Sequence, residues 1–325
     1  MICTTPFHLE TKAGSYNPIT GEHEKYIPVN CNKCPACIDR RIKQWAFRLH
    51  EEWKQSKSAY FVTLTYNEEN LPLHRPNGHF IPIPILKKRD LELFFKRLRG
   101  HDKRRKTPTM HEAQQLQRMG VKRITRDSRL KRPPIKYLAV GELGSKTLRP
   151  HYHAVIFNTF PKHIEDSWKL GRIDIKPYHP NSAMYTMKYL QSETPPEHKQ
   201  WENEEWYVKP YQVQSKNLGM CYLVNEDGEP TNMYQWHQNA PLCRNFVTLP
   251  YGQKTAIPEP FKEILWDDAT RTQIRHDIHY TLREKEADEK AEIQKQGKDW
   301  AEWQVSKHKA ALNVFKKANY KRNKI

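Results

Sequence analysis

Two histidines stand two positions apart in an apolar run, in the sequence His151-Tyr-His153. If this run forms a β-strand, both imidazoles point to the same face, because alternate residues of a strand share a face. Two such imidazoles can bind one metal ion, and imidazole suits Mn, Fe, Co, Ni or Zn better than Mg. Glu142 ends the preceding strand-like run and would lie beside His151 in a hairpin, as an anionic third ligand. A divalent ion there could polarise a phosphodiester. The alternative is a structural pair of histidines beside a solvent-exposed carboxylate.

Tyr185 and Tyr189 stand four residues apart in a segment that predicts a helix over 183–191. They share one helix face, and Lys188 borders it. A phenol with a pKa of about 10 is a poor nucleophile at neutral pH, so a neighbouring cation and a metal-activated phosphate would both help it. A tyrosine that attacks a phosphodiester forms a covalent intermediate that conserves the bond energy, so the cut strand can be rejoined without ATP. The alternative is an ordinary amphipathic helix with tyrosines at the core boundary.

Three cysteines, Cys31, Cys34 and Cys37, form a C-x-x-C-x-x-C pattern, and Cys3 could supply a fourth thiolate. Four thiolates suit a structural zinc ion, which is tetrahedral and closed to substrate. An iron–sulfur cluster fits less well, because the run C-x₂-C-x₂-C-x₃-C-P is not completed. Reduced thiols packed in a turn are the remaining alternative.

The elements that must position these groups follow from the periodicity of apolar residues. β-Branched and aromatic runs predict three strands, the last two joined as a hairpin, at 59–66, 135–142 and 151–158. Apolar faces predict two further helices, at about 40–54 and 90–99. Residues 258–325 are charged and largely helical in composition.

The chain of 325 residues carries 55 Lys and Arg against 37 Asp and Glu, a net charge of +18. Nucleic acid is the polyanion that fits best, because each neutralised phosphate releases counterions. A membrane partner fits poorly, because the basic residues form no amphipathic stripe and no apolar run approaches the length of a membrane helix. Residues 87–133 carry 17 Lys and Arg against five Asp and Glu, a net charge of +12, which predicts a DNA-contacting surface. The expected contacts are Lys96, Arg97, Arg99, Lys103, Arg104, Arg105 and Lys106.

The first residues, Met1-Ile-Cys-Thr-Thr-Pro, lack the basic and apolar regions of a signal peptide. We therefore expect a cytoplasmic protein whose thiols stay reduced. In that compartment the six cysteines favour metal ligands or buried thiols over disulfides.

The order of the motifs points to a known family. They are Phe61-Val-Thr-Leu-Thr-Tyr66, then Gly141-Glu-Leu-Gly with Arg149-Pro-His-Tyr-His-Ala-Val-Ile-Phe157, then Tyr185-Thr-Met-Lys-Tyr189. Together they resemble the three successive motifs of HUH endonucleases. Two further segments make the chain resemble microvirus replication initiation proteins of the gokushovirus type. These are the cysteine motif followed by Arg40-Arg-Ile-Lys-Gln-Trp-Ala-Phe-Arg-Leu49, and Leu91-Glu-Leu-Phe-Phe-Lys-Arg-Leu-Arg99. The resemblance covers residues 1 to about 195.

The resemblance implies an α+β fold: a central antiparallel sheet with flanking helices, a Cys-rich N-terminal element and a helical C-terminal region. It implies a Cys-rich element and helix at 1–55, and an HUH nuclease domain at 56–195 with a basic insertion at about 100–134. The C-terminal region at 196–325 has no assigned role. Tyr152 stands where the family has a bulky apolar residue, and we expect its side chain to point to the other face of the sheet.

The resemblance also implies roles for the site residues. His151, His153 and Glu142 match the ligands of a divalent ion, Mg²⁺ or Mn²⁺. Tyr185 matches the nucleophile, with Lys188 assisting, and Tyr189 matches the second tyrosine seen where two alternate between cleavage and joining.

The implied activity is cleavage of a phage origin through a 5′-phosphotyrosyl intermediate, which frees a 3′-OH for priming and later allows the strand to be rejoined. The implied partners are phage origin DNA, single-stranded or supercoiled, and the host replication helicase and polymerase in the bacterial cytoplasm. Two alternatives stay open. One is a non-catalytic basic nucleic-acid-packaging protein, and the other is a relaxase or transposase of the same chemistry.

Overall fold

A computed structural model describes residues 3, 7–16, 21, 23–104, 114, 133–144, 147–179, 193–307, 309, 310 and 313 of the chain. The chain divides into two compact units. One is Arg48–Cys221, and the other joins Met1–Phe47 to Tyr222–Ile325. Among the described residues, no helix combines the length and the apolar character that crossing a membrane requires.

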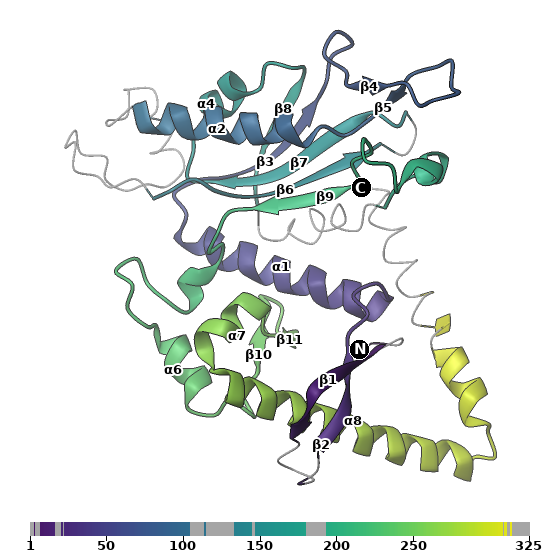
Figure 1. Cartoon of the computed structure of the whole chain (residues 1–325). Coiled ribbons are helices and arrows are strands. Elements are labelled where there is room, and N and C mark those ends of the chain that lie inside the picture. The colour runs from purple at the N-terminus through teal and green to yellow at the C-terminus, as the bar shows by residue number, and fades with distance from the viewer. Residues whose placement is uncertain are drawn as a thin grey trace. The chain divides into compact units, whose positions relative to one another are not determined.

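The unit Arg48–Cys221 is built on a five-stranded sheet in which every neighbouring pair is antiparallel (Figure 1). The strands lie in the order β8 (Ile173–Pro177), β3 (Ala59–Thr65), β7 (Pro150–Phe157), β6 (Lys136–Leu143) and β9 (Tyr211–Gln214). β6 and β7 are consecutive and form a hairpin, so the central strand of the sheet is hydrogen-bonded to neighbours on both sides.

Burial along the two central strands explains their place in the sheet. In β3, Tyr60, Val62 and Leu64 are buried and alternate with half-buried residues, the period of two that a strand produces. In β7, every residue from Tyr152 to Phe157 is buried, as expected for a strand covered on both faces.

Two helices, α2 (Lys88–Arg104) and α4 (Pro161–Ser167), lie together on one face of the sheet (Figure 1). The apolar residues of α2 recur three and four positions apart, so they form one stripe. This stripe is at most 2% exposed and consists of Leu91, Phe94, Phe95 and Leu98. It packs into the core formed by the even-numbered side chains of β3 and β7 and by Trp168.

Two short elements follow the sheet strands in the same unit. A small hairpin, β4 (Leu73–His74) with β5 (Ile83–Pro84), comes directly after β3. The 3₁₀-helix η3 (Pro196–Trp201) precedes β9.

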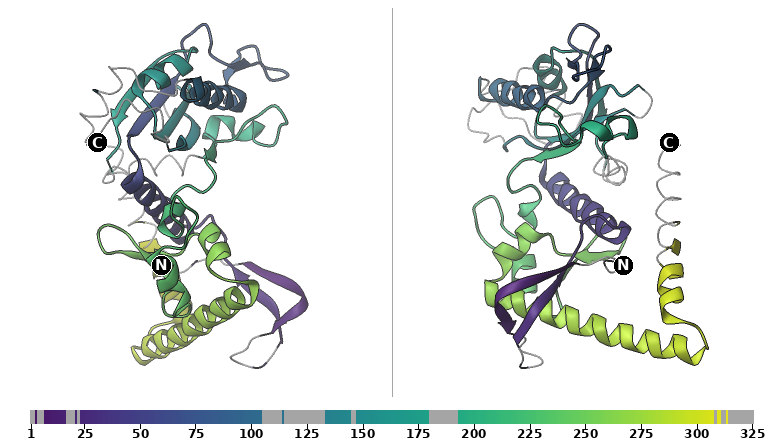
Figure 2. Two further views of the ribbon diagram at one scale, coloured as in Figure 1. Left: turned by 90° about the vertical axis from the view of Figure 1, so that its left-hand side faces the viewer. Right: turned by 45° about the vertical axis from the view of Figure 1, so that its right-hand side comes forward.

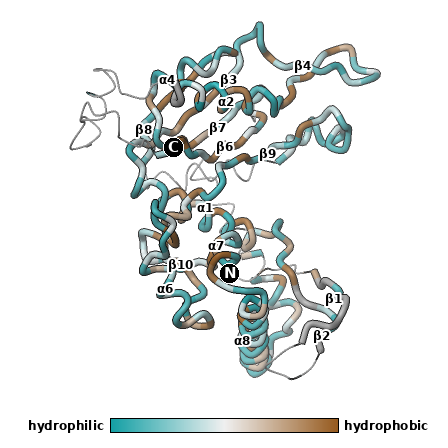
Figure 3. The backbone as a smooth tube through the Cα atoms, turned by 60° about the vertical axis from the view of Figure 1, so that its left-hand side comes forward, coloured by the Kyte–Doolittle hydropathy of each residue, from teal (hydrophilic) through white to brown (hydrophobic). Residues whose placement is uncertain are grey.

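The other unit contains the N-terminal and C-terminal elements. Its strands are β1 (Phe7–Tyr16) paired with β2 (His23–Val29), and β10 (Phe246–Thr248) paired with β11 (Lys254–Ala256). Its helices are the first part of α1 (Pro35–Gln55), α6 (Asn232–Gln238), α7 (Glu259–Leu265) and α8 (Asp268–Lys295), with the 3₁₀-helix η4 (Met220–Tyr222) at the boundary. Phe47, Tyr222 and Phe261 pack against one another at its core. α8 is one long continuous helix and largely hydrophilic (Figures 2 and 3).

The predicted α+β fold is confirmed, with its central antiparallel sheet, flanking helices, Cys-rich element and C-terminal helices. The three predicted strands are β3, β6 and β7, and two predicted helices are α1 and α2. β8 and β9 were not predicted from the sequence, and β9 carries the sheet beyond residue 195. The helix expected at 183–191 and most of the basic segment 100–134 lie outside the described residues. The expected domain boundaries stay a prediction.

Candidate functional site

Strand register brings the predicted metal ligands together at one end of the sheet. Glu142 of β6 lies directly opposite His151 of β7, and Thr63 of β3 lies opposite His153. The Nε2 atom of His153 is 3.3 Å from Oε1 of Glu142. The rings of His151 and His153 are parallel within 3°, with centroids 6.3 Å apart. The hairpin geometry and the shared face expected for these three residues are therefore present.

Hydrogen bonds fix the orientation of each imidazole. The Nδ1 atom of His151 is 2.7 Å from the carbonyl oxygen of Arg149. Because a carbonyl only accepts, Nδ1 carries the proton and Nε2 keeps its lone pair for a ligand. Nδ1 of His153 is 3.2 Å from the hydroxyl of Thr63, so its Nε2 faces Glu142. Burial lowers the pKa of His151, which favours the neutral form that binds metals.

Two imidazole nitrogens and one carboxylate form a donor set that suits a divalent transition ion. Their atoms do not yet converge as ligands. Within the described part of the chain, the four-cysteine cluster is the group of three or more metal-binding side chains whose ligand atoms lie within 4.8 Å of one another. Bringing Glu142, His151 and His153 onto one ion therefore requires side-chain rotation, while the backbone register already suits it.

Gly144 makes room for His151. A Cβ atom at position 144 would lie 3.1 Å from Cε1 and 3.3 Å from Nδ1 of the His151 ring. The Gly144 N–H also donates to the Arg149 carbonyl at 2.9 Å. Sequence reasoning assigned this glycine to the hairpin connection and missed its contact with the imidazole.

Tyr152 points to the opposite face from the histidines, as expected, and its side chain is fully buried. Its hydroxyl donates to the carbonyl of Lys87 at 3.0 Å and accepts from the Lys87 N–H at 3.1 Å. It also lies 3.0 Å from the hydroxyl of Tyr66, which donates to Asp90 at 2.8 Å. Burial raises the pKa of Tyr152, so this hydroxyl stays protonated. The network joins the histidine strand to the start of α2.

Arg149 is a functional candidate that sequence reasoning did not single out. Its guanidinium donates to the carbonyl of Tyr66 at 2.9 Å and pairs with Glu68 at 2.5 Å. It thereby ties the β6–β7 hairpin to the chain that leaves β3. A signal was available, since Arg149 stands two positions before His151 in a motif of known order.

The predicted tyrosine site lies outside the described residues, because Tyr185, Lys188 and Tyr189 all fall in the segment 180–192. Their placement relative to the histidines stays a prediction.

The predicted DNA contacts are described only in part. Lys96 and Arg99 are exposed on α2, and Arg99 lies over the ring of Tyr137 at 5.9 Å. Arg97 donates to the Ser167 carbonyl at 2.8 Å, which anchors α2 to α4. The others are outside the described residues or, within α2, have side chains that are not described: Lys103, Arg104, Arg105 and Lys106.

The four cysteines of the N-terminal element do converge. Cys31 and Cys37 have sulfur atoms 4.0 Å apart, and those of Cys34 and Cys3 are 3.8 Å apart. A tetrahedral ion with zinc–sulfur bonds of about 2.3 Å places its sulfurs about 3.8 Å apart, so the cluster has the size of a tetrathiolate site. All four are free thiols.

Local backbone structure prepares this cluster. Asn32 has a φ of 58°, and the turn that it makes lets the N–H groups of Lys33 and Cys34 donate to the Cys31 sulfur at 3.4 and 3.2 Å. Burial raises the pKa of Cys37 to about 12, and a bound cation would reverse this by deprotonating the thiol. The cluster can hold a metal ion such as Zn²⁺.

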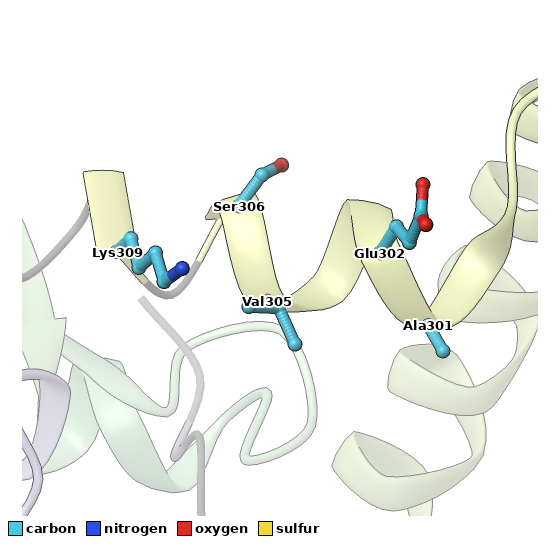
Figure 4. Close-up of a pocket in the computed structure, with 5 residues that line it drawn as sticks. All are labelled: Ala301, Glu302, Val305, Ser306 and Lys309. Atoms are coloured by element: carbon cyan, nitrogen blue, oxygen red, sulfur yellow. The ribbon is translucent and has the colours of Figure 1, made fainter.

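A hollow on the C-terminal helical residues is a poor candidate site. It has a volume of about 430 Å³ and is lined by Ala301, Glu302, Val305, Ser306 and Lys309. Ala301 and Val305 point to one side of the helix and Glu302 and Ser306 to the other (Figure 4). One helical segment therefore supplies all of the lining, with no convergent set of polar groups.

Comparison with known proteins places the sheet in a family context. Residues 59–194 match a family of replication-associated proteins of the ORF2 type. Replication-associated protein VP4 of Bdellovibrio phage phiMH2K is 25% identical over 289 residues, which cover 83% of this chain and 78% of that protein. The chain is a relative of microvirus replication proteins.

Two further relatives match over shorter stretches. Replication-associated protein ORF2 of Spiroplasma virus 4 is 35% identical over 135 residues, 40% of this chain and 32% of that protein. Replication-associated protein ORF4 of Chlamydia phage 1 is 22% identical over 187 residues, 51% of this chain and 38% of that protein. No solved structure matches the chain. The resemblance predicted from the motifs is confirmed, whereas nicking and the tyrosine nucleophile stay predictions.

Proposed function

We propose that this chain initiates rolling-circle replication of a single-stranded DNA phage by nicking the origin and later rejoining the strand. The observation that carries the proposal is the pairing of Glu142 with His151, with Nε2 of His153 3.3 Å from the same carboxylate. This donor set lies on the sheet of a segment that matches replication-associated proteins. The basic composition of the chain supports a DNA substrate.

The proposed cleavage is a transfer of a phosphoryl group to a tyrosine. The phenolic oxygen of Tyr185 attacks the scissile phosphorus and loses its proton, with Lys188 favouring the phenolate. The bond from phosphorus to the 3′ oxygen breaks, which leaves a 5′-phosphotyrosyl link and a free 3′-OH. The reverse reaction joins the strand, and Tyr189 provides a second nucleophile for alternating rounds.

Glu142, His151 and His153 would hold a divalent ion, Mg²⁺ or Mn²⁺, which supplies charge stabilisation to the phosphate oxygens when bound. The chain's own contribution is positional. The Arg149 carbonyl and the Thr63 hydroxyl hold the imidazoles with Nε2 available. In the same proposal, Zn²⁺ at Cys3, Cys31, Cys34 and Cys37 has a structural role only.

The proposed partners are phage origin DNA and the host replication helicase and polymerase, in the host bacterial cytoplasm. The relatives support the replication role through their names alone.

The test is covalent capture of a labelled origin strand. Wild-type protein with Mn²⁺ should nick the strand and stay attached to the new 5′ end, and Tyr185→Phe should abolish the adduct while leaving DNA binding nearly intact. An adduct that persists in Tyr185→Phe would make Tyr189 the primary nucleophile. Unchanged nicking in the double variant would sink the tyrosine assignment, and cleavage by a protein with both His151 and His153 replaced by alanine would sink the metal site.

A further inference from the structure

The β4–β5 hairpin presents two large apolar side chains to solvent. Phe80 is 95% exposed and Ile81 is 77% exposed. They follow a tight turn in which Gly78 has a φ of 79° and the His79 N–H donates to the Pro76 carbonyl at 3.1 Å. Adjacent apolar side chains exposed to this degree are typical of a binding surface.

Contacts with the segment before β9 hold this hairpin in place. The His74 ring stacks on Trp206 with centroids 3.9 Å apart and planes within 19°. The His79 ring meets Trp201 edge-on at 5.2 Å. The hairpin base is closed by the Ile85 N–H, which donates to the Pro72 carbonyl at 3.0 Å. An exposed tip on an anchored base loses little conformational freedom when it binds a partner.

Strand register places the hairpin at the same end of the sheet as the candidate site. The chain enters the hairpin after Thr65, the last residue of β3, which lies opposite His151. The anchoring segment leads into Tyr211 of β9, which lies opposite Gly141, next to Glu142. Figure 1 shows β4 and β5 beyond this end of β3 and β7.

The charge of the hairpin region suits a phosphate backbone. Residues 71–89 contain no Asp or Glu. Exposed cations flank the apolar tip: Arg75 within the hairpin and Lys87, Lys88 and Arg89 after it. Single-stranded nucleic acid is bound by this combination, in which cations neutralise phosphates and aromatic rings stack on bases.

We propose that Phe80 and Ile81 stack against unpaired bases of single-stranded DNA and so position the strand at the Glu142–His151 end of the sheet. The inference rests on the proposed nicking function for its choice of partner. An anionic membrane surface and a second copy of the chain are the other occupants that an apolar tip with basic flanks could take. DNA is favoured because the tip adjoins the proposed phosphodiester site.

The test measures binding of full-length protein to a labelled oligothymidylate by fluorescence anisotropy at one fixed salt concentration. Replacing both Phe80 and Ile81 by alanine should raise the Kd for the single strand by about 10-fold or more, the usual loss when a base–aromatic stack is removed. Affinity for a duplex of the same length should stay unchanged. Phe80→Trp keeps an aromatic surface and should retain wild-type affinity. Tyr251→Ala removes another exposed aromatic ring (71% exposed) outside this unit and is the matched control.

Three results would overturn the inference. They are an unchanged Kd for the single strand, an equal loss for duplex and single strand, and unchanged DNA affinity alongside lost binding to phosphatidylglycerol vesicles or lost dimerisation. The adduct assay, run on the same preparations, separates this inference from the proposed function. Adduct formation by wild type with no effect of the tip variants would overturn the inference alone. Tip-dependent binding without any adduct from wild type would overturn the nickase alone.

Discussion

Replacing Tyr152 by phenylalanine should destabilise the sheet unit without removing the histidines from their strand. The change deletes one hydroxyl that makes two hydrogen bonds to Lys87 and one to Tyr66, and it keeps the ring packing. No cavity opens, so the cost is that of unmade hydrogen bonds. Lys87 is exposed and Tyr66 keeps its bond to Asp90, so water and Asp90 recover part of the loss. We therefore expect a loss of about 1–2 kcal/mol, at the lower end of the range for buried polar groups.

The assay is urea unfolding followed by circular dichroism, with the transition of this unit fitted separately because two compact units need not unfold together. Tyr178→Phe is the matched control. Tyr178 is also buried, and its hydroxyl has no hydrogen-bond partner among the described residues. Removing that hydroxyl should leave stability unchanged or raise it slightly. Equal effects of the two substitutions would refute the role given to the Tyr152 network.

Two further predictions concern the other unit. Cys34→Ser should lower bound zinc from about one ion per chain to near none, because three thiolates leave a tetrahedral site incomplete. Elemental analysis tests this, with the exposed Cys243 replaced by serine as control, and equal zinc in both variants would contradict it. His237 is fully buried, donates from Nδ1 to the Arg244 carbonyl and accepts at Nε2 from Tyr222, and burial lowers its pKa. Below about pH 6.5 the unfolded chain takes up a proton that folded His237 does not, so stability should fall as pH falls. A His237→Gln variant with the same pH slope between about pH 7.5 and 5.5 as wild type would contradict this.

The sequence predicted the elements whose periodicity is strong and whose partners are near in the chain. β6 and β7 are consecutive and apolar, so the pairing of Glu142 with His151 followed from a hairpin alone. β9 is short, alternates polar residues and pairs with a strand far away in sequence, so no local signal marked Tyr211–Gln214. β8 is equally short and ends in a proline, Pro177, which suits an edge strand.

Side-chain partners were less predictable than strands. The roles of Thr63 and Arg149 depend on which strands are neighbours, which the sequence does not state locally. Cys37 was expected in a turn, yet α1 already begins at Pro35. A proline suits the first turn of a helix because its missing N–H has no partner there in any case. The order of the motifs compensated for these gaps, because it indicated the family before any contact was known.

The central position of β7 has a consequence for how the site can be lost. Its amides are protected by β3 on one side and β6 on the other, and its side chains from Tyr152 onward are buried. Strands of this kind exchange their amide hydrogens only when the whole cooperative unit opens. The histidines therefore belong to the slowest-exchanging part of the unit, whereas the short strand β9, bonded only to β6, can fray independently. A destabilised variant should keep a normal site in every folded molecule and lose activity only in proportion to the molecules that have unfolded.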